Sequence, residues 1–317
     1  MTGQTMNACI FPGQGSQSVG MLDAWGDHPV VRDTLAEASE ALGQDVAQLI
    51  AQGPAEALAL TTNTQPVMLV AGVAAYRVWL AAGGATPDWV AGHSLGEYAA
   101  LVAAGSLTLS QAVPLVRLRA EAMQAAVPVG TGAMAAILGM PADQVVAHCQ
   151  AVQQTFAPTS GEVVEAVNFN DPNQTVIAGS KTAVEQAMAV IKAAGAKRAL
   201  PLPVSAPFHS SLMRPAAEKL ATHLTSVSLL PPQIPVLNNI DVAAPTDPIA
   251  IKDALVRQAF GPVRWVESVQ TLAAQGVTKM VECGPGKVLT GMAKRIEPTV
   301  VAVCAYDPPS LEEALAA

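Results

Sequence analysis

The segment Trp89–Ala104, WVAGHSLGEYAALVAA, changes from a strand pattern to a helix pattern within a few residues. Trp89–Ala91 is short and apolar, which predicts a buried strand, and Glu97–Ala104 predicts a helix that Gly105 ends. Between them lies a G-x-S-x-G motif, Gly92–Gly96, whose glycines allow the backbone to turn sharply. A strand that passes through a tight turn into a helix indicates an α/β fold.

Ser94 occupies the middle of this motif. At the start of a helix, free N–H groups and the helix dipole favour a developing oxyanion, as a nucleophile requires. The alternative is a serine that merely caps a helix between two glycines, because the bare motif arises often by chance. The strand before it and the helix after it favour a nucleophile.

The rest of the chain also alternates strands and helices. Within residues 130–204 the order is strand, helix, two strands, helix and strand, with Asn170–Asn173 as the turn between the paired strands. This βαββαβ order is typical of ferredoxin-like folds. We therefore expect residues 130–198 to form a small subdomain inserted into a larger α/β domain of residues 1–129 and 199–317, with the substrate cleft between them. The individual elements expected here are strands Ala133–Leu138, Val163–Asn168, Thr175–Ala178 and Ala199–Val204, and helices Pro141–Gln153 and Lys181–Ala194.

Composition excludes several classes of protein. Hydrophobic residues make up 51% of the 317 residues and charged residues 13%, which excludes a disordered chain. A net charge of −8 disfavours binding to nucleic acid. The charge-free runs 57–76, 98–116 and 122–142 are interrupted by Pro, Gln, Thr or Ser, so we expect buried elements rather than membrane spans.

The cysteines and the N-terminus bear on metals and on location. Four cysteines stand apart without metal-ligand spacing, so no metal site is expected. The first basic residue is Arg32, so the N-terminus lacks the positive region of a signal peptide. A cytoplasmic protein with reduced cysteines is the expectation.

A serine nucleophile needs a base, and His209 is the best placed of five histidines. It follows the last strand expected in the small subdomain, where a strand end meets the cleft, and it comes after Ser94 in the chain. His93 adjoins Ser94 but is expected to point away from it. A loop histidine that caps a helix is the alternative for His209. No Asp or Glu stands out as a third member, so we expect a Ser–His dyad.

Arg119 has apolar neighbours at helical spacing, including Leu115, Val116, Ala122 and Met123. A buried arginine stays charged and requires an anion, which favours a role in gripping a substrate carboxylate. The alternative is a side chain that extends to the surface.

Two Gly-rich segments fail the nucleotide-binding patterns. Phe11–Gln17 has Ser18 where a dinucleotide fingerprint needs its third glycine, and Gly284–Lys287 lacks the flanking residues of a P-loop. The first loop fits an oxyanion hole better, as a source of backbone N–H groups beside the nucleophile.

Together these segments resemble the malonyl-CoA:acyl carrier protein transacylase family of bacterial fatty-acid synthesis. The matching pieces run in order through nearly the whole chain: Phe11–Gly20, Gln65-Pro66, Gly92–Ala99, Gly130–Ala136, Asn168–Asn170, Pro207–Met213, Asn238-Asn239 and Gly284–Leu289. GHSLGE alone also occurs in polyketide-synthase acyltransferase domains, but the full set is specific.

The resemblance implies a function and a role for each site residue. Ser94 would carry malonyl as an ester, His209 would be the base, and Arg119 would clamp the malonyl carboxylate. Backbone N–H groups of Gln14 and Leu95 would form the oxyanion hole. The main-chain carbonyl of Gln258 would orient the histidine in place of an acid.

The resemblance also implies selectivity, fold and partners. Phe208 would crowd a C2 methyl and so favour malonyl over methylmalonyl. The implied fold is a hydrolase-like α/β domain with a ferredoxin-like insert. The implied partners are malonyl-CoA and acyl carrier protein, without nucleic acid, membrane, metal or redox cofactor. Two rival functions remain: a serine esterase or thioesterase on the same turn, and a non-catalytic carrier-binding protein.

Overall fold

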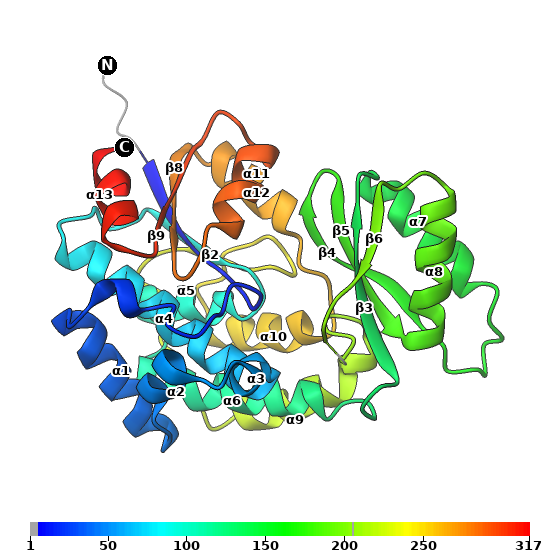
Figure 1. Ribbon diagram of the computed structural model, residues 1–317, viewed down its shortest axis with the longest axis horizontal. Coiled ribbons are helices and arrows are strands. Elements are labelled where there is room, and N and C mark those ends of the chain that lie inside the picture. The colour runs from blue at the N-terminus through cyan, green and yellow to red at the C-terminus, as the bar shows by residue number, and fades with distance from the viewer. Residues whose placement is uncertain (1–5, 205) are drawn as a thin grey trace.

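The computed structural model describes residues 6–204 and 206–317. Within these residues the larger sheet has five parallel strands in the order β7-β2-β1-β8-β9 (Figure 1). Both faces of β1 are buried: Cys9 and Phe11 face one hydrophobic cluster, and Ala8 and Ile10 face the other. Burial on both faces is why Ala8–Phe11 of this strand reads as an unbroken apolar run. The strands are β1 Met6–Phe11, β2 Trp89–Gly92, β7 Val236–Leu237, β8 Val277–Cys283 and β9 Val301–Ala305.

Helices cover the two faces of this sheet (Figure 1). The cluster around Cys9 and Phe11 includes residues of α4 Thr61–Ala81, α5 Gly96–Ala103 and α6 Leu109–Gln124. The cluster around Ala8 and Ile10 includes residues of α11 Trp265–Ala274 and α12 Val288–Ile296. The remaining helices of this part are α1 Pro29–Leu42, α2 Val46–Gln52, α3 Ala55–Ala59, α9 Arg214–Leu224, α10 Pro248–Ala259 and α13 Pro308–Ala316, with short 3-10 turns at Asp23–Trp25 and Ser211–Met213.

The apolar run Pro66–Ala82 predicts a helix that begins at the proline, whereas helix α4 begins at Thr61, five residues earlier. A proline inside a helix removes one i→i−4 hydrogen bond and crowds the carbonyl four residues back, so it disfavours but does not prevent a helix that has already begun upstream. Nearly every side chain from Thr64 to Trp79 is buried, which explains the absence of a polar stripe on this helix. Among the described helices, none is long and apolar enough to cross a membrane.

The second sheet is antiparallel, with strand order β4-β5-β3-β6. Figure 1 shows it at one end of the molecule, with α7 and α8 on its outer face. On β3, Ala135 and Ile137 pack beneath those helices, while Met134 faces the larger part of the protein. Side chains that alternate between two faces produce this division. The elements are β3 Gly132–Leu138, α7 Ala142–Gln153, β4 Val164–Asp171, β5 Gln174–Ser180, α8 Lys181–Ala193 and β6 Arg198–Pro201.

The ferredoxin-like topology of the insert is thus confirmed, but its last strand differs from the expectation. The strand expected over Ala199–Val204 ends at Pro201, the last residue in register with β3. The Leu202 N–H still donates to the Met134 carbonyl of β3, but the Val204 N–H then turns back to the Leu202 carbonyl at 2.8 Å. The boundary expected at residue 198 falls on the first residue of β6, so the sheet extends three residues beyond it.

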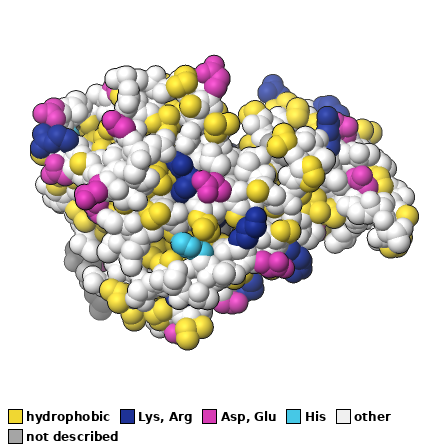
Figure 2. Space-filling model, turned by 90° about the horizontal axis from the view of Figure 1, so that it is seen from below, with side chains coloured by type: hydrophobic (Ala, Val, Ile, Leu, Met, Phe, Trp, Pro, Cys, Tyr) yellow, Lys and Arg dark blue, Asp and Glu magenta, His cyan; other side chains and the backbone are white. Residues whose placement is uncertain are grey.

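Backbone hydrogen bonds join the two parts. The Val263 N–H donates to the Val167 carbonyl at 2.8 Å, and the Phe169 N–H donates to the Val263 carbonyl at 2.9 Å. Arg295 adds an ion pair with Asp171 at 2.8 Å. Strand β4 is therefore held directly against the larger part, beside the loop that carries the G-x-S-x-G motif. On the face drawn in Figure 2, basic and acidic side chains are interspersed rather than gathered by sign.

Candidate active site

Ser94 lies in a strained turn between β2 and α5. Its φ of 54° is in the left-handed region, which non-glycine residues rarely adopt. The flanking glycines make the turn possible: a Cβ on Gly92 would lie 2.0 Å from the backbone of Gly96, and one on Gly96 would lie 2.2 Å from the Phe11 carbonyl oxygen. No larger residue fits at either place, so the motif is required by packing and holds Ser94 at the helix start.

His209 lies next to Ser94, with its Nε2 2.7 Å from Ser94 Oγ. Its Nδ1 lies 2.9 Å from the Gln258 carbonyl oxygen, which only accepts, so the ring proton belongs on Nδ1. Nε2 then keeps a lone pair for the serine proton. His209 is also in the left-handed region, with a φ of 66°.

The environment of His209 keeps the ring neutral. Burial and, after it, the nearby charge of Arg119 lower the pKa of His209 to about 3. A neutral imidazole at physiological pH is a competent proton acceptor, and the strained backbone places its lone pair on the serine.

Arg119 extends from α6 into the same site with only 1% of its surface exposed. Its guanidinium donates to Gln65 Oε1 at 2.5 Å, to Gln258 Oε1 at 3.0 Å and to Ser94 Oγ at 3.1 Å. Burial lowers its pKa, although a guanidinium stays protonated in proteins. Within residues 6–204 and 206–317 it has no carboxylate partner at ion-pair distance, and its Nε has no hydrogen-bond partner. The surface position considered as an alternative is excluded.

A cavity of about 290 Å³ connects these groups. Ser94, His209 and Arg119 line it, together with residues expected to form the oxyanion hole, Gln14 and Leu95. Among the described residues, neither backbone N–H of Gln14 and Leu95 has an acceptor. The apolar wall of the cavity includes Met123, Met134, Leu202, Val204 and Phe208, the last of which is 6% exposed.

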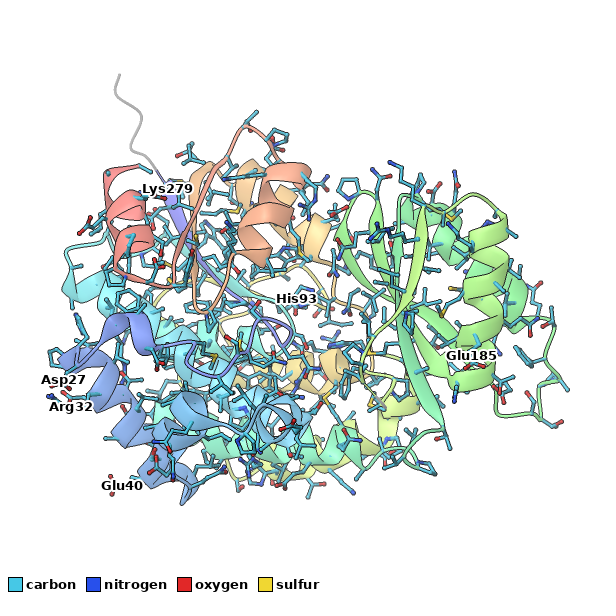
Figure 3. The ribbon with its side chains drawn as sticks, viewed as in Figure 1. Asp27, Arg32, Glu40, His93, Glu185 and Lys279 are labelled. Carbon is cyan, nitrogen blue, oxygen red and sulfur yellow. The ribbon has the colours of Figure 1, made fainter. Side chains whose placement is uncertain are left out.

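His93 points away from the serine. Its Nε2 lies 2.8 Å from Asn170 Oδ1, and its ring packs against Trp265 with centroids 5.7 Å apart. Figure 3 labels His93 between the larger part and the antiparallel sheet. Burial lowers its pKa, so it too is neutral. His93 therefore contributes to the contact between the two parts.

Sequence reasoning missed two residues that support the site, Glu97 and Asn239. Asn239 accepts the Ser94 N–H at 2.7 Å and donates to the Gly92 carbonyl at 2.7 Å, which fixes the strained turn from outside. Glu97 is 2% exposed and accepts hydrogen bonds from the Asn239 N–H and from Gln258 Nε2, each at 2.9 Å. A signal was present: Glu97 is an acid three residues after the serine, at the start of an otherwise uncharged helix.

No candidate metal centre accompanies this site. In the described part of the chain, no group of three His, Cys, Asp or Glu side chains is arranged to hold a metal ion. The chemistry that the geometry permits is nucleophilic: a serine with its base, backbone donors for an oxyanion, and a fixed cation for an acidic substrate.

This constellation matches a known family. The family model described as "Acyl transferase domain" matches residues 8–301. The chain belongs to the acyl transferase family. A malonyl CoA-acyl carrier protein transacylase of Escherichia coli K12 is 54% identical over 312 residues, which cover 98% of this chain and 99% of that protein.

Solved structures of acyltransferases agree over the full length. An acyl-carrier-protein S-malonyltransferase from Burkholderia pseudomallei is 61% identical with a TM-score of 0.95, over 99% of this acyltransferase and 100% of that chain. A malonyl-transacylase solved with a type II polyketide-synthase acyl-carrier protein is 50% identical with a TM-score of 0.94, over 98% of this chain and 99% of that one. The hydrolase-like core with its small insert is the fold shared with these acyltransferases.

Proposed function

We propose that this acyltransferase moves a malonyl group from malonyl-CoA to the phosphopantetheine thiol of acyl carrier protein, through an ester on Ser94. The observation that carries the proposal is the Arg119 guanidinium, buried 3.1 Å from Ser94 Oγ without a carboxylate partner among the described residues. A buried cation beside the nucleophile suits an acyl group that ends in a carboxylate. A simple esterase has no need of one. The names of the transacylase relatives support the same assignment.

In the first half-reaction, His209 Nε2 takes the proton of Ser94 as Oγ attacks the thioester carbon. A C–O bond forms and the carbonyl oxygen becomes an oxyanion, which the N–H groups of Gln14 and Leu95 would stabilise. Collapse of this intermediate breaks the C–S bond, and the departing sulfur of coenzyme A receives the proton from His209. Losing one such oxyanion donor typically lowers kcat by about 10²–10³.

The second half-reaction repeats these steps with a different thiol. The phosphopantetheine thiol gives its proton to His209, and its sulfur attacks the ester carbon. The C–O bond breaks, and Ser94 Oγ recovers the proton. Because one product leaves before the second substrate reacts, the kinetics are ping-pong, and no cofactor takes part.

Arg119 would do more than select the substrate. Its charge helps to hold the pKa of His209 at about 3, which disfavours the imidazolium that each step must form. A malonyl carboxylate on Arg119 offsets that charge, so the correct acyl group makes His209 a stronger base. Gln65 accepts from one terminal nitrogen of the guanidinium, and Gln258 accepts from the other, which also donates to Ser94, so these contacts fix its orientation in the site.

Phe208 would set selectivity at C2 of the acyl group. It lies in the apolar wall of the cavity and is almost completely buried. A ring in that wall leaves little room for an extra methyl, and one methyl changes discrimination by about 1–3 kcal/mol. The proposal therefore includes preference for malonyl over methylmalonyl without complete exclusion.

The test is intact-mass measurement after incubation with malonyl-CoA. The natural chain should gain one malonyl group, and Ser94→Ala should gain none. An adduct that persists in Ser94→Ala would contradict the nucleophile assignment, and an unmodified natural chain would favour the non-catalytic alternative. Continuous release of free malonate without acyl carrier protein would favour the hydrolase.

Arg119→Ala tests the clamp separately. Malonyl transfer should fall by roughly 10²-fold or more, in line with loss of a charged hydrogen-bonded contact of about 3 kcal/mol, while acetyl transfer should change much less. Arg119→Lys is the matched control, because it keeps the charge but loses the planar fork. Equal losses for both acyl groups in Arg119→Ala would refute the clamp. Because the proposed substrates, malonyl-CoA and acyl carrier protein, belong to bacterial fatty-acid synthesis, the proposal extends to the cytoplasm as the compartment.

A further inference from the structure

Glu97 is a buried acid that the proposed reaction does not use. It lies in the first turn of α5, and one oxygen, Oε2, accepts from both the Asn239 N–H and Gln258 Nε2. A narrow cavity of about 10 Å³, near the volume that one water needs, lies beside it and is also lined by Asn238 and Pro245. The Glu97 carboxyl group is thus hydrogen-bonded to Asn239 and Gln258 and also borders a space about the size of one water molecule.

A single amide connects Glu97 with Arg119. Gln258 donates from Nε2 to Glu97 at 2.9 Å and accepts at Oε1 from Arg119 at 3.0 Å. A carboxylate only accepts and a guanidinium only donates, so this amide has one orientation in which both contacts are satisfied. Glu97 is therefore the nearest negative charge in the hydrogen-bond network around Arg119, held one residue away from it.

The charges that act on Glu97 come from two places. Arg119 on α6 favours the ionised carboxylate, and Asp241 in the loop after β7 disfavours it. Strands β1, β2 and β7, which lie beside α5, contain no charged residue, and Arg77 of α4 pairs with Glu37 at 2.8 Å. His209 and His93 are neutral because burial lowers the pKa of each. Burial favours the neutral form of Glu97, the hydrogen bonds from Asn239 and Gln258 favour the carboxylate, and the charge of Arg119 adds to the carboxylate side. Loss of that charge therefore moves the balance toward the neutral form.

We propose that binding of a malonyl carboxylate at Arg119 makes Glu97 take up a proton from solvent. In the free enzyme, Arg119 offsets the charge of Glu97 through Gln258. When the substrate carboxylate occupies Arg119, two anions share one buried cation, and the neutral form of Glu97 becomes favourable. Burial already raises the pKa of Glu97 to about 7, so a modest further rise changes its state near neutral pH. This inference rests on the proposed malonyl function.

The coupling has a directional consequence. Ligand binding that takes up a proton weakens as pH rises above the pKa of the free group. Malonyl-CoA should therefore bind more weakly at about pH 8 than at about pH 6, by up to tenfold for each pH unit above that pKa. Acetyl-CoA, which has the same coenzyme but no carboxylate, should lack this dependence.

Calorimetry in two buffers with different ionisation enthalpies measures the protons taken up on binding. Ser94→Ala is the starting protein, because it binds the thioester without ester formation or thiol release. At about pH 8, uptake with malonyl-CoA should approach one proton more than with acetyl-CoA, and at about pH 6 the difference should be severalfold smaller. The isosteric Ser94→Ala/Glu97→Gln should abolish the difference. Ser94→Ala/Glu282→Gln, which alters a buried acid outside the cavity, should retain it.

The outcomes separate this inference from the function beneath it. Failure of malonyl-CoA to bind at all would overturn both. Binding with the same proton uptake for malonyl-CoA and acetyl-CoA would overturn the inference alone, even if Glu97→Gln fails to fold. A difference that survives in the Glu97→Gln protein would also overturn it, because the proton would then be on another group.

Discussion

Two strand–loop–helix turns lie on either side of β1, and each has a buried acid that it uses differently. In the turn from β8 to α12, Glu282 accepts the N–H groups of Leu289 and Thr290 at 3.1 and 2.7 Å, which satisfies the start of that helix. In the turn from β2 to α5, Glu97 accepts from Asn239 and Gln258 instead. Leu95, which lines the cavity, has a backbone N–H without an acceptor among the described residues.

The difference shows how one structural unit serves either packing or chemistry. A helix start filled by its own protein's carboxylate cannot bind a developing oxyanion, whereas an unfilled one can. Burial raises the pKa of both acids to about 7, so the two turns differ in where the carboxyl points rather than in how deeply it is buried.

The largest expected effect is the loss of malonyl transfer when the nucleophile of the β2–α5 turn is removed. Ser94→Ala should lower malonyl transfer by about 10⁴-fold or more, as removal of a nucleophile does. Its melting temperature should change by only a few degrees, because the turn is held by glycine contacts and by Asn239. Transfer rate and thermal melting of the same sample measure both. Residual transfer within tenfold of the natural chain would contradict the role of this turn.

Alanine at one glycine in each turn compares their tolerance of a side chain. A Cβ on Gly96 would lie 2.2 Å from the Phe11 carbonyl oxygen, whereas one on Gly286 would lie 3.2 Å from the flexible Ser16 side chain. Gly96→Ala should cost about 3 kcal/mol or more and abolish transfer, because backbone must move. Gly286→Ala should cost about 1–2 kcal/mol through its φ of 82° and keep transfer. Chemical denaturation measures both; equal costs would show that the turns are not packed differently.

Glu282→Gln should affect stability without affecting chemistry. Each oxygen of Glu282 accepts a different backbone N–H, and an amide presents a donor to one of them. We expect a loss of about 1–3 kcal/mol in unfolding free energy, with malonyl transfer within twofold of the natural rate. A large loss of transfer in a folded Glu282→Gln protein would mean that this turn also serves the active site.

The smallest expected effect is the response of stability to alkaline pH. Both acids have a folded pKa raised from 4.5 to about 7, so their contribution is fully present below 4.5 and is lost as pH rises through 7. The pKa of His209 is lowered, so its contribution is already complete above its unfolded value of 6.5. Between about pH 6.5 and 8, unfolding free energy should fall by roughly 1 kcal/mol per acid. In denaturant titrations, Glu97→Gln and Glu282→Gln should each show a fall in unfolding free energy that is smaller by the contribution of one acid. An unchanged pH dependence in both variants would contradict the raised pKa values.

Much of the architecture could be predicted from local patterns. The strand and helix around Gly92–Gly96, the βαββαβ order and the family resemblance were all confirmed. Errors arose where tertiary contacts set the boundary: Pro66 lies inside α4 rather than at its start, and β6 ends at Pro201 once its pairing with β3 stops. Neither limit is encoded in the residues next to it.

The site was less accessible to prediction than the fold. Arg119 has apolar neighbours at helical spacing, which indicated a buried cation, and the structure places its guanidinium beside Ser94. The partners that hold it, Gln65 and Gln258, come from distant segments. Glu97 and Asn239 were missed because their role depends on a contact across 142 positions of sequence.

The sequence by itself determined the turn at Ser94, because two glycines are needed where an added Cβ would lie about 2 Å from neighbouring backbone atoms. It also determined a large hydrophobic core, because a chain with 51% hydrophobic and only 13% charged residues lowers its free energy by removing apolar side chains from water. Only the tertiary structure decided that Glu282 accepts the backbone N–H groups at the start of α12, whereas no carboxylate does so at the start of α5 among the described residues. It also decided that Gln258 hydrogen-bonds to both Glu97 and Arg119. Hydrogen bonds require alignment within a few tenths of an ångström, and such alignment between distant segments exists only after the chain has packed.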